Sequence, residues 1–234
     1  MHPDVPASGC CVWANLVWWP LCSNKPVNVR EHWEGVYRSN SPGSVSWYQP
    51  HLETSFEMIR RVAEDVDSAI LDVGGGESTL VDDLIAAGYR NISVSDISTT
   101  ALDVTKKRLG AAAEGVRWIA GDVTAALSVP QDSVDLWHDR AVFHFLTEAE
   151  DRAAYIRNMR RCMRPGGHVI IGTFGPEGPT RCSGLPVVRY DSTLMQRELG
   201  TEFSLVETRE EMHLTPGGAT QQFVYSCFKV PLSE

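Results

Sequence analysis

The segment that most constrains this chain of 234 residues is a strand pattern that runs into three consecutive glycines. Residues 69–78 read AILDVGGGES, and a helical pattern follows from Thr79. Glycines in such a turn let the backbone approach a ligand closely, and the helix N-terminus behind them offers a positive end. A buried strand, a Gly-rich turn and a helix in this order predict a nucleotide-cofactor site.

The acid before the glycines discriminates among nucleotide cofactors. Dinucleotide loops follow the pattern G-x-G-x-x-G and usually have no acid just before it. Here Asp72 lies two residues before Gly74, and Thr79 occupies the third-glycine position. The run from Asp72 to Gly76 resembles the D/E-x-G-x-G motif of class I S-adenosylmethionine (SAM) methyltransferases. Ser78 is a departure, because many members of that family have a third glycine there.

Later steps of the same pattern follow in order along the chain. Asp96 ends a second strand pattern and lies 20 residues after Gly76, the spacing expected for a carboxylate that binds a ribose diol. Asp122 follows a third strand pattern, and in the family that position faces the exocyclic amine of adenine. The run Arg164-Pro-Gly-Gly resembles the family's L-x-P-G-G turn. The resemblance covers roughly residues 31–230.

The resemblance implies that SAM is the cofactor and that S-adenosylhomocysteine (SAH) is the product. It places the cofactor at the ends of the first four strands. The residues expected to bind it are Asp72, Gly74, Gly75, Gly76, Asp96, Ile97, Asp122, Val123 and His138.

Strand and helix patterns alternate along the chain, which predicts βαβ units and a parallel sheet. Two alternating segments near 204–209 and 220–230 predict a β-hairpin. The resemblance implies an α/β, doubly wound, mostly parallel sheet of seven strands with this antiparallel hairpin at its C-terminal end and helices on both faces. The expected strands lie near 69–73, 92–95, 116–120, 133–138 and 167–173, and the expected helices lie near 79–88, 98–109 and 148–163.

No linker-like stretch interrupts the motif order, so we expect a single SAM-dependent methyltransferase domain over residues 31–234. Residues 10–22 differ in character, because they contain three tryptophans and no charge. Residues 1–9 contain no Lys or Arg, which argues against a secretory signal. We expect an N-terminal extension or a lid over the cofactor mouth for residues 1–30.

Composition argues against several classes of protein. The net charge is −9 and the basic clusters are short, so we expect no nucleic-acid partner. No apolar run approaches the length of a membrane span, so we expect no membrane partner. The six cysteines include no C-x-x-C pair, which favours free thiols and a cytoplasmic location. No ligand spacing is typical of a metal site, so we expect no metal.

The fourth strand pattern ends in the run Trp137-His-Asp-Arg-Ala141, at the edge where a doubly wound sheet binds its ligands. His138 and Asp139 are therefore the candidate catalytic residues. His138 could act as a general base, since imidazole titrates near neutral pH, or could be a hydrogen-bonded structural histidine. A metal site built from both residues and His144 is disfavoured, because strand neighbours point to opposite faces.

Two segments that are far apart in the sequence are expected to meet over this edge and to form the substrate mouth. One is the aromatic segment before the first strand, and the other is the irregular segment 181–190 after the fifth strand. The expected substrate residues are Tyr37, Trp47, Tyr48, Phe143, Cys182, Arg189 and Tyr190.

We expect direct in-line methyl transfer from SAM. The step from Asp139 to Ala141 resembles that of thiopurine and small-thiol methyltransferases. No acidic docking insert or extra domain is visible in the sequence, which favours a small-molecule substrate, such as one with a thiol or another soft atom, over a protein. Trp33 and Tyr37, with Trp47 further on, resemble the W-x-x-x-Y … W pattern of protein-lysine methyltransferases, so lysine is the alternative. A non-catalytic SAM-binding or assembly module is the alternative of another class, and the glycine motif disfavours a nicotinamide oxidoreductase.

Overall fold

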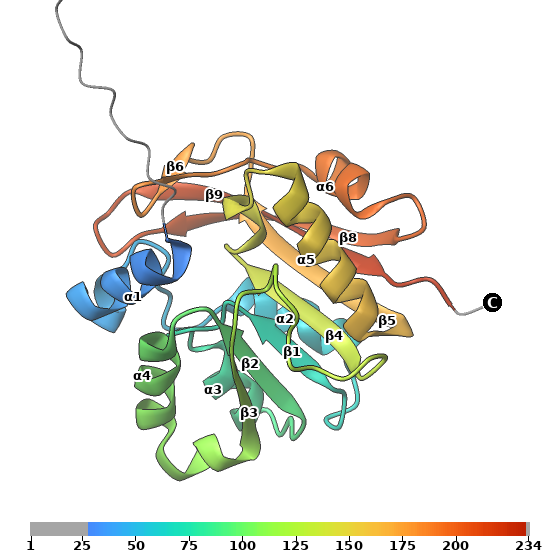
Figure 1. The fold of residues 1–234 in the computed structure, drawn as a ribbon, viewed down its shortest axis with the longest axis horizontal. Coiled ribbons are helices and arrows are strands. Elements are labelled where there is room, and N and C mark those ends of the chain that lie inside the picture. The colour runs from blue at the N-terminus through green and yellow to red at the C-terminus, as the bar shows by residue number, and fades with distance from the viewer. Residues whose placement is uncertain (1–27, 233–234) are drawn as a thin grey trace, which may run out of the picture.

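The computed structural model describes residues 28–232 (Figure 1). Its main sheet has the strand order β3-β2-β1-β4-β5-β9-β8. The first five strands in this order run parallel, and β9 pairs antiparallel with β5 and with β8. The predicted fold class, with its antiparallel C-terminal hairpin, is confirmed. The strands are β1 (Ile70–Val73), β2 (Ile92–Asp96), β3 (Val116–Ala120), β4 (Val134–Arg140), β5 (Met163–Phe174), β8 (Ser204–Leu214) and β9 (Thr220–Lys229).

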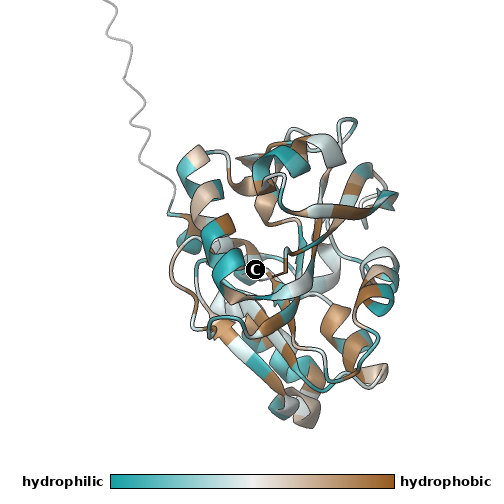
Figure 2. Cartoon of the chain, turned by 90° about the vertical axis from the view of Figure 1, so that its right-hand side faces the viewer, coloured by the Kyte–Doolittle hydropathy of each residue, from teal (hydrophilic) through white to brown (hydrophobic). Residues whose placement is uncertain are grey.

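Helices cover both faces of the sheet, and each face has its own hydrophobic core (Figure 2). Helices α2, α3 and α4 pack on one face, and α5 and α6 pack on the other. The helices are α1 (Val29–Ser39), α2 (Glu53–Val62), α3 (Leu80–Ala86), α4 (Thr99–Leu109), α5 (Ala149–Cys162) and α6 (Ser192–Leu199), with short 3-10 turns at Pro42–Ser44, Gly110–Gly115 and Phe143–Phe145. A separate two-stranded ribbon pairs β6 (Arg181–Cys182) with β7 (Leu185–Pro186).

Strand β4 sends alternate side chains to the two faces, as the two-residue period of a strand requires. Leu136 packs in the core under α2, whereas Trp137 packs in the core under α5. His138 continues the first face, where it bonds to Ser55 of α2. Asp139 continues the second face, where it bonds to Tyr155 of α5. This alternation decides which residues at the end of β4 can reach the cofactor side.

Helix α1 docks against the start of α4 through charged and polar contacts. The Glu34 carboxylate accepts hydrogen bonds from the Thr99 amide (2.7 Å) and from the hydroxyls of Thr99 and Thr100. Burial raises the pKa of Glu34, but these bonds outweigh that effect and lower it to about 2. Arg30 donates to the Ile97 carbonyl at 2.6 Å. These contacts hold α1 over the ends of the parallel strands.

The extension expected over residues 1–30 falls mainly on residues 1–27, which lie outside the described residues. Val29 and Arg30 belong to α1. Within residues 28–232, no helix combines the length and the apolar character needed to cross a membrane.

Candidate functional site

Two adjoining cavities lie at the carboxyl ends of the parallel strands. Cavity 1 is lined by Tyr48, Gln49, Asp72, Gly75, Glu77 and His138, among others. Cavity 2 is lined by Trp33, Asp96, Ile97, Asp122, Val123, Phe145 and Cys182, among others. The residues common to both are Tyr37, Trp47, Val73, Gly74 and Arg140, so the two cavities form one continuous site.

The glycine turn brings the backbone directly against two carboxylates. A Cβ on Gly75 would lie 2.5 Å from Asp72 Oδ2, and one on Gly76 would lie 2.7 Å from Asp96 Oδ2 and 3.0 Å from the Tyr37 hydroxyl. Gly74 has φ 67°, and a Cβ there would collide with Val142. Only glycine fits these positions, so the turn forms a cradle of backbone and carboxylates that fits SAM.

A buried histidine orients Asp72 through a hydrogen bond. The register of β1 and β4 places Asp72 opposite His138. His138 Nδ1 lies 2.7 Å from Asp72 Oδ1, and its Nε2 lies 2.9 Å from the Ser55 hydroxyl. Since a carboxylate only accepts, the imidazole donates from Nδ1 and accepts the hydroxyl proton at Nε2. Both ring nitrogens are therefore occupied, so His138 positions Asp72 and is not free to act as a general base.

Asp96 ends β2 beneath the glycine turn. Its Oδ1 accepts from the Ser98 amide at 2.7 Å, and the side chain is buried. Burial is the main cause that raises its pKa to about 7. Two hydroxyl donors of a ribose would supply the hydrogen bonds that favour the ionised form. The placement agrees with the predicted ribose contact.

Asp122, Ile97 and Val123 lie together in cavity 2, as expected for the adenine end of the site. Asp122 Oδ1 accepts from the amide and the hydroxyl of Thr124, at 2.8 and 2.7 Å. The apolar side chains of Ile97 and Val123 supply surfaces suited to the faces of a planar base. The hydrogen bonds from Thr124 fix the turn after β3, with the Asp122 carboxylate at cavity 2.

Asp139 does not line either cavity, so the structure does not support the catalytic role expected for it. It is fully buried on the α5 face, where it accepts from the amides of Val142 (2.9 Å) and Phe143 (3.0 Å) and from the Tyr155 hydroxyl (2.7 Å). Burial raises its pKa to about 6, and these bonds oppose that rise. Asp139 stabilises the turn after β4, in which Ala141 has φ 69°.

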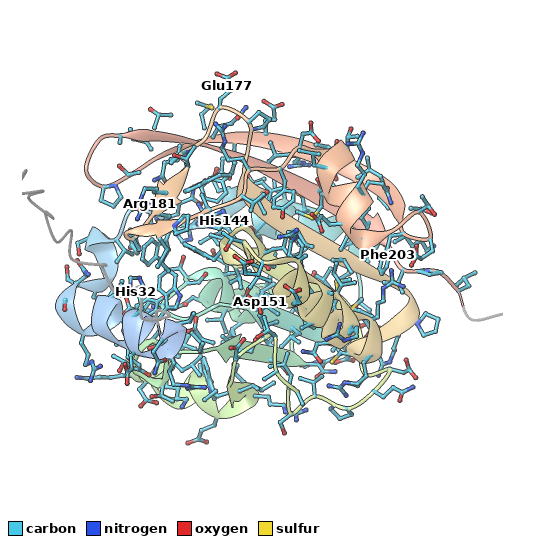
Figure 3. All side chains as sticks on the ribbon, turned by 45° about the horizontal axis from the view of Figure 1, so that its top comes forward. His32, His144, Asp151, Glu177, Arg181 and Phe203 are labelled. Atoms are coloured by element: carbon cyan, nitrogen blue, oxygen red, sulfur yellow. The ribbon has the colours of Figure 1, made fainter. Side chains whose placement is uncertain are left out.

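Four aromatic side chains that line cavity 2 form what we call the aromatic wall: Trp33, Tyr37, Trp47 and Phe145. The Trp33 ring centroid lies 5.0 Å from that of Phe145 and 5.8 Å from that of Trp47, edge to face. The Tyr37 and Trp47 centroids lie 6.2 Å apart. Cys182 of the β6–β7 ribbon lines the same cavity, and Figure 3 shows its neighbour Arg181 on the same side of the molecule as α1. The two distant segments expected at the substrate mouth therefore do meet.

Three expected substrate residues lie elsewhere. Phe143 and Tyr190 are buried in the core on the α5 face, with ring centroids 5.5 Å apart. Arg189 donates to the carbonyls of Pro176 (2.6 Å) and Gly178 (3.3 Å) and stabilises the loop after β5. A substrate role for these three residues is not supported, because their side chains serve packing and loop structure.

Sequence reasoning missed three polar residues at the site, Gln49, Glu77 and Arg140. A signal existed for Arg140, because it lies two residues after His138 on the same strand and so shares its face. Glu77 directly follows the glycines and lines cavity 1 together with Tyr37 of α1. No group of three or more His, Cys, Asp or Glu side chains suited to a metal ion occurs within residues 28–232.

Comparison with known proteins agrees with this geometry. A family model described as a methyltransferase domain matches residues 70–167. An uncharacterised methyltransferase of Oceanobacillus iheyensis is 26% identical over 148 residues, which cover 62% of this chain and 65% of that protein. EEF1A lysine methyltransferase 2 of Danio rerio is 28% identical over 160 residues, which cover 62% and 68%. The matched part thus spans about two thirds of these relatives.

Solved structures share the fold at low sequence identity. A protein in a structure entitled "Conversion of a Disulfide Bond into a Thioacetal Group during Echinomycin Biosynthesis" has a TM-score of 0.68 at 18% identity, covering 88% of this chain and 93% of that one. The Burkholderia thailandensis 1,6-didemethyltoxoflavin-N1-methyltransferase, with bound SAH, has a TM-score of 0.68 at 16% identity, covering 86% and 87%.

Residues 70–167 match a methyltransferase domain, and these comparisons support the class I SAM-dependent methyltransferase superfamily, with SAM as the cofactor. The matched domain and the relatives named as methyltransferases indicate methyl transfer from SAM. The groups that would hold SAM are the glycine turn, Asp72, Asp96 and the Asp122 turn. When bound, SAM supplies an activated methyl group on a sulfonium.

We predict that Asp96→Asn weakens SAH binding about 10- to 100-fold, because charge-assisted bonds to the ribose contribute ~1.5–3 kcal/mol. Wild-type affinity should also fall as the pH drops below about 7, because the ribose donates to the ionised carboxylate. Titration calorimetry between pH 5.5 and 8.5 measures both effects. Asp103→Asn, on the outer surface of α4, is the matched control. Unchanged affinity in Asp96→Asn would remove this residue from the site.

Replacing His138 should affect cofactor binding through Asp72. We predict that His138→Ala weakens SAH binding about 5- to 30-fold, since an oriented hydrogen bond to a charged group contributes ~1–2 kcal/mol. His138→Asn should retain most of the affinity, because its amide can donate to Asp72. Calorimetry together with kcat separates this role from acid–base chemistry. If His138→Asn binds SAH normally but loses turnover, the residue acts as a base after all.

Proposed function

We propose that the protein transfers the methyl group of SAM to a small-molecule nucleophile with a soft reacting atom, most simply a thiol sulfur. The sulfonium is already activated, so the protein mainly needs to align the two reactants and to exclude water. The aromatic wall suits both tasks, because rings attract a nearby positive charge and form a dry surface.

One observation carries the choice of nucleophile: among residues 28–232, the aromatic wall has no group suited to remove a proton. Burial raises the pKa of Cys182, and burial together with the charge of Asp96 raises the pKa of Tyr37 well above its usual value. Both nitrogens of His138 are occupied. A thiol, with a pKa of about 8.5, supplies its own anion near neutral pH, whereas a lysine ammonium, at about 10.4, does not.

A lysine side chain is the second candidate, and two observations support it. The eEF1A lysine methyltransferase of Danio rerio is 28% identical to this chain, and the chain's Trp33 and Tyr37 lie at the cavity. Four aromatic rings could surround an amine as they could surround a thiol. The two candidates differ in their need for a base: a thiol forms its own anion, whereas a lysine ammonium must first lose a proton to another group. An experiment can separate these cases.

The test is methyl transfer from labelled SAM to thiols, selenols, amines and cell-extract proteins. We expect label in small thiols, with kcat/KM rising about tenfold per pH unit up to the pKa of the thiol used, because only the thiolate reacts. A set of thiols with different pKa values should shift the profile accordingly. With SAM saturating at every pH, one enzyme pKa common to every thiol would contradict the proposal, as would label found in protein lysines alone.

The aromatic wall should determine acceptor affinity. We predict that Trp47→Ala raises the acceptor KM about tenfold, which corresponds to ~1.4 kcal/mol of lost contact. Trp47→Phe, which keeps a ring, should change it by less than about threefold. Arg189→Ala is the control, because Arg189 lies in the loop after β5 and not at the cavity. Equal KM values for Trp47→Ala and wild type would place the acceptor elsewhere.

A further inference from the structure

Arg140 is a buried cation at the junction of the two cavities, and one of its nitrogens lacks a partner. It ends β4, is only 9% exposed and lines both cavities. Among the described residues that line either cavity, it is the only Lys or Arg. Its Nη2 makes no hydrogen bond within residues 28–232. Buried polar groups are normally paired, so this nitrogen indicates a ligand that brings a hydrogen-bond acceptor.

Three contacts fix the guanidinium of Arg140 in one orientation. Its Nε donates to the Tyr225 hydroxyl at 2.9 Å, and its Nη1 donates to the Trp47 carbonyl at 3.0 Å. The guanidinium carbon lies 4.4 Å from the centroid of the Phe223 ring. Glu211 Oε1 lies 3.8 Å from Nη2, so it offsets part of the charge but is beyond hydrogen-bond distance. The remaining nitrogen is therefore already in place for an anionic atom.

The position of Arg140 favours the methyl acceptor as its partner over either end of the cofactor. Asp72 lines cavity 1, whereas Asp96 and Asp122 line cavity 2, so the residues common to both cavities lie between these groups. In SAM the sulfonium joins the amino acid to the adenosine, and a methyl acceptor has to approach it there. Trp47, whose carbonyl accepts from Arg140, belongs to the aromatic wall that is expected to contact the acceptor.

The charge of Arg140 also acts on the side of cavity 2 formed by the β6–β7 ribbon. Cys182 lines that cavity, and although burial raises its pKa, the charge of Arg140 is one of the effects that lower it. A negative group on the acceptor is therefore stabilised at this side, whereas a lysine ammonium would meet a like charge. SAM itself has a net positive charge, which adds to the attraction for an anion.

We propose that Arg140 binds a carboxylate of the small-molecule acceptor, so that the protein prefers a thiol that also carries an acid group. This inference rests on the proposed function, because it takes a small molecule at the aromatic wall as the acceptor. Arg140 fixes one end of that molecule and leaves its sulfur free to reach the methyl group. The residue thus determines specificity and takes no part in the bond that forms.

The test compares two thiols that differ in one charge, 4-(mercaptomethyl)benzoate and 4-(mercaptomethyl)benzamide. At a pH of about 7 both thiol groups are largely protonated, so only the benzoate is an anion. SAH replaces SAM, so titration calorimetry measures acceptor binding without methyl transfer. We expect the SAH-bound wild-type protein to bind the benzoate about 10- to 100-fold more tightly, because the amide cannot make the charge-assisted bond to Nη2.

Replacing Arg140 should remove this preference. In Arg140→Gln we expect the ratio of the two affinities to fall below about threefold, with SAH affinity retained. Arg140→Lys should keep part of the preference, because it retains the charge but not the planar fork. Arg61→Gln, an exposed α2 arginine paired with Glu207, is the matched control and should keep the full preference. Retained SAH binding shows that a variant is folded.

Equal affinity of the wild-type protein for the two thiols would overturn the proposal, whether or not the variants fold. A preference that survives in Arg140→Gln would do the same. So would a loss of SAH affinity in Arg140→Gln that Arg140→Lys reverses, since Arg140 would then bind the cofactor. Failure of the proposed function is seen separately, as the absence of label from both thiols when SAM replaces SAH, because the binding preference needs no turnover.

Discussion

The hydrogen bond between His138 and Asp72 joins the two central strands of the sheet at the end where the cofactor site lies. A buried carboxylate with an unpartnered oxygen can turn toward any donor, so its orientation depends on the imidazole. Ser55 of α2 holds that imidazole in turn. The free Asp72 oxygen therefore stays against the backbone of Gly75, and the glycine turn can serve as a cradle for a charged ligand.

Successive side chains at the end of β4 point to opposite faces of the sheet and have different roles. His138 and Arg140 point to the cavity face, where one orients Asp72 and the other presents a guanidinium. Asp139 points to the opposite face and accepts two backbone amides of the following turn. That turn holds Ala141 in the left-handed region and brings Phe145 to the aromatic wall. His138 and Arg140 thus lie at the cavity, whereas Asp139, between them in the sequence, stabilises the turn after β4.

Local chemistry explains which features could be predicted from sequence. Strand order, the glycine turn and the acid at the end of β2 depend on short patterns, and the structure contains each of them. The positions of Phe143 and Tyr190 depend on which way a loop turns after a strand, which packing against α5 decides. We predicted both residues at the cavity, whereas the structure has them in the core on the α5 face. Glu77 lines cavity 1 together with Tyr37 of α1, and no spacing within the glycine motif indicates that position.

The same groups that prepare the site for SAM destabilise the protein that lacks it. Burial raises the pKa of Asp96 to about 7 and raises that of Glu77, so the folded state holds their protons more tightly than the unfolded chain does. Their contribution to stability is therefore fully present below the ordinary carboxylate pKa and is lost as the pH rises through the raised values. At neutral pH the fold carries a partly ionised, poorly solvated Asp96 carboxylate, and a ligand that donates to it relieves that cost. Cofactor affinity and the stability of the ligand-bound fold thus arise from the same buried carboxylates.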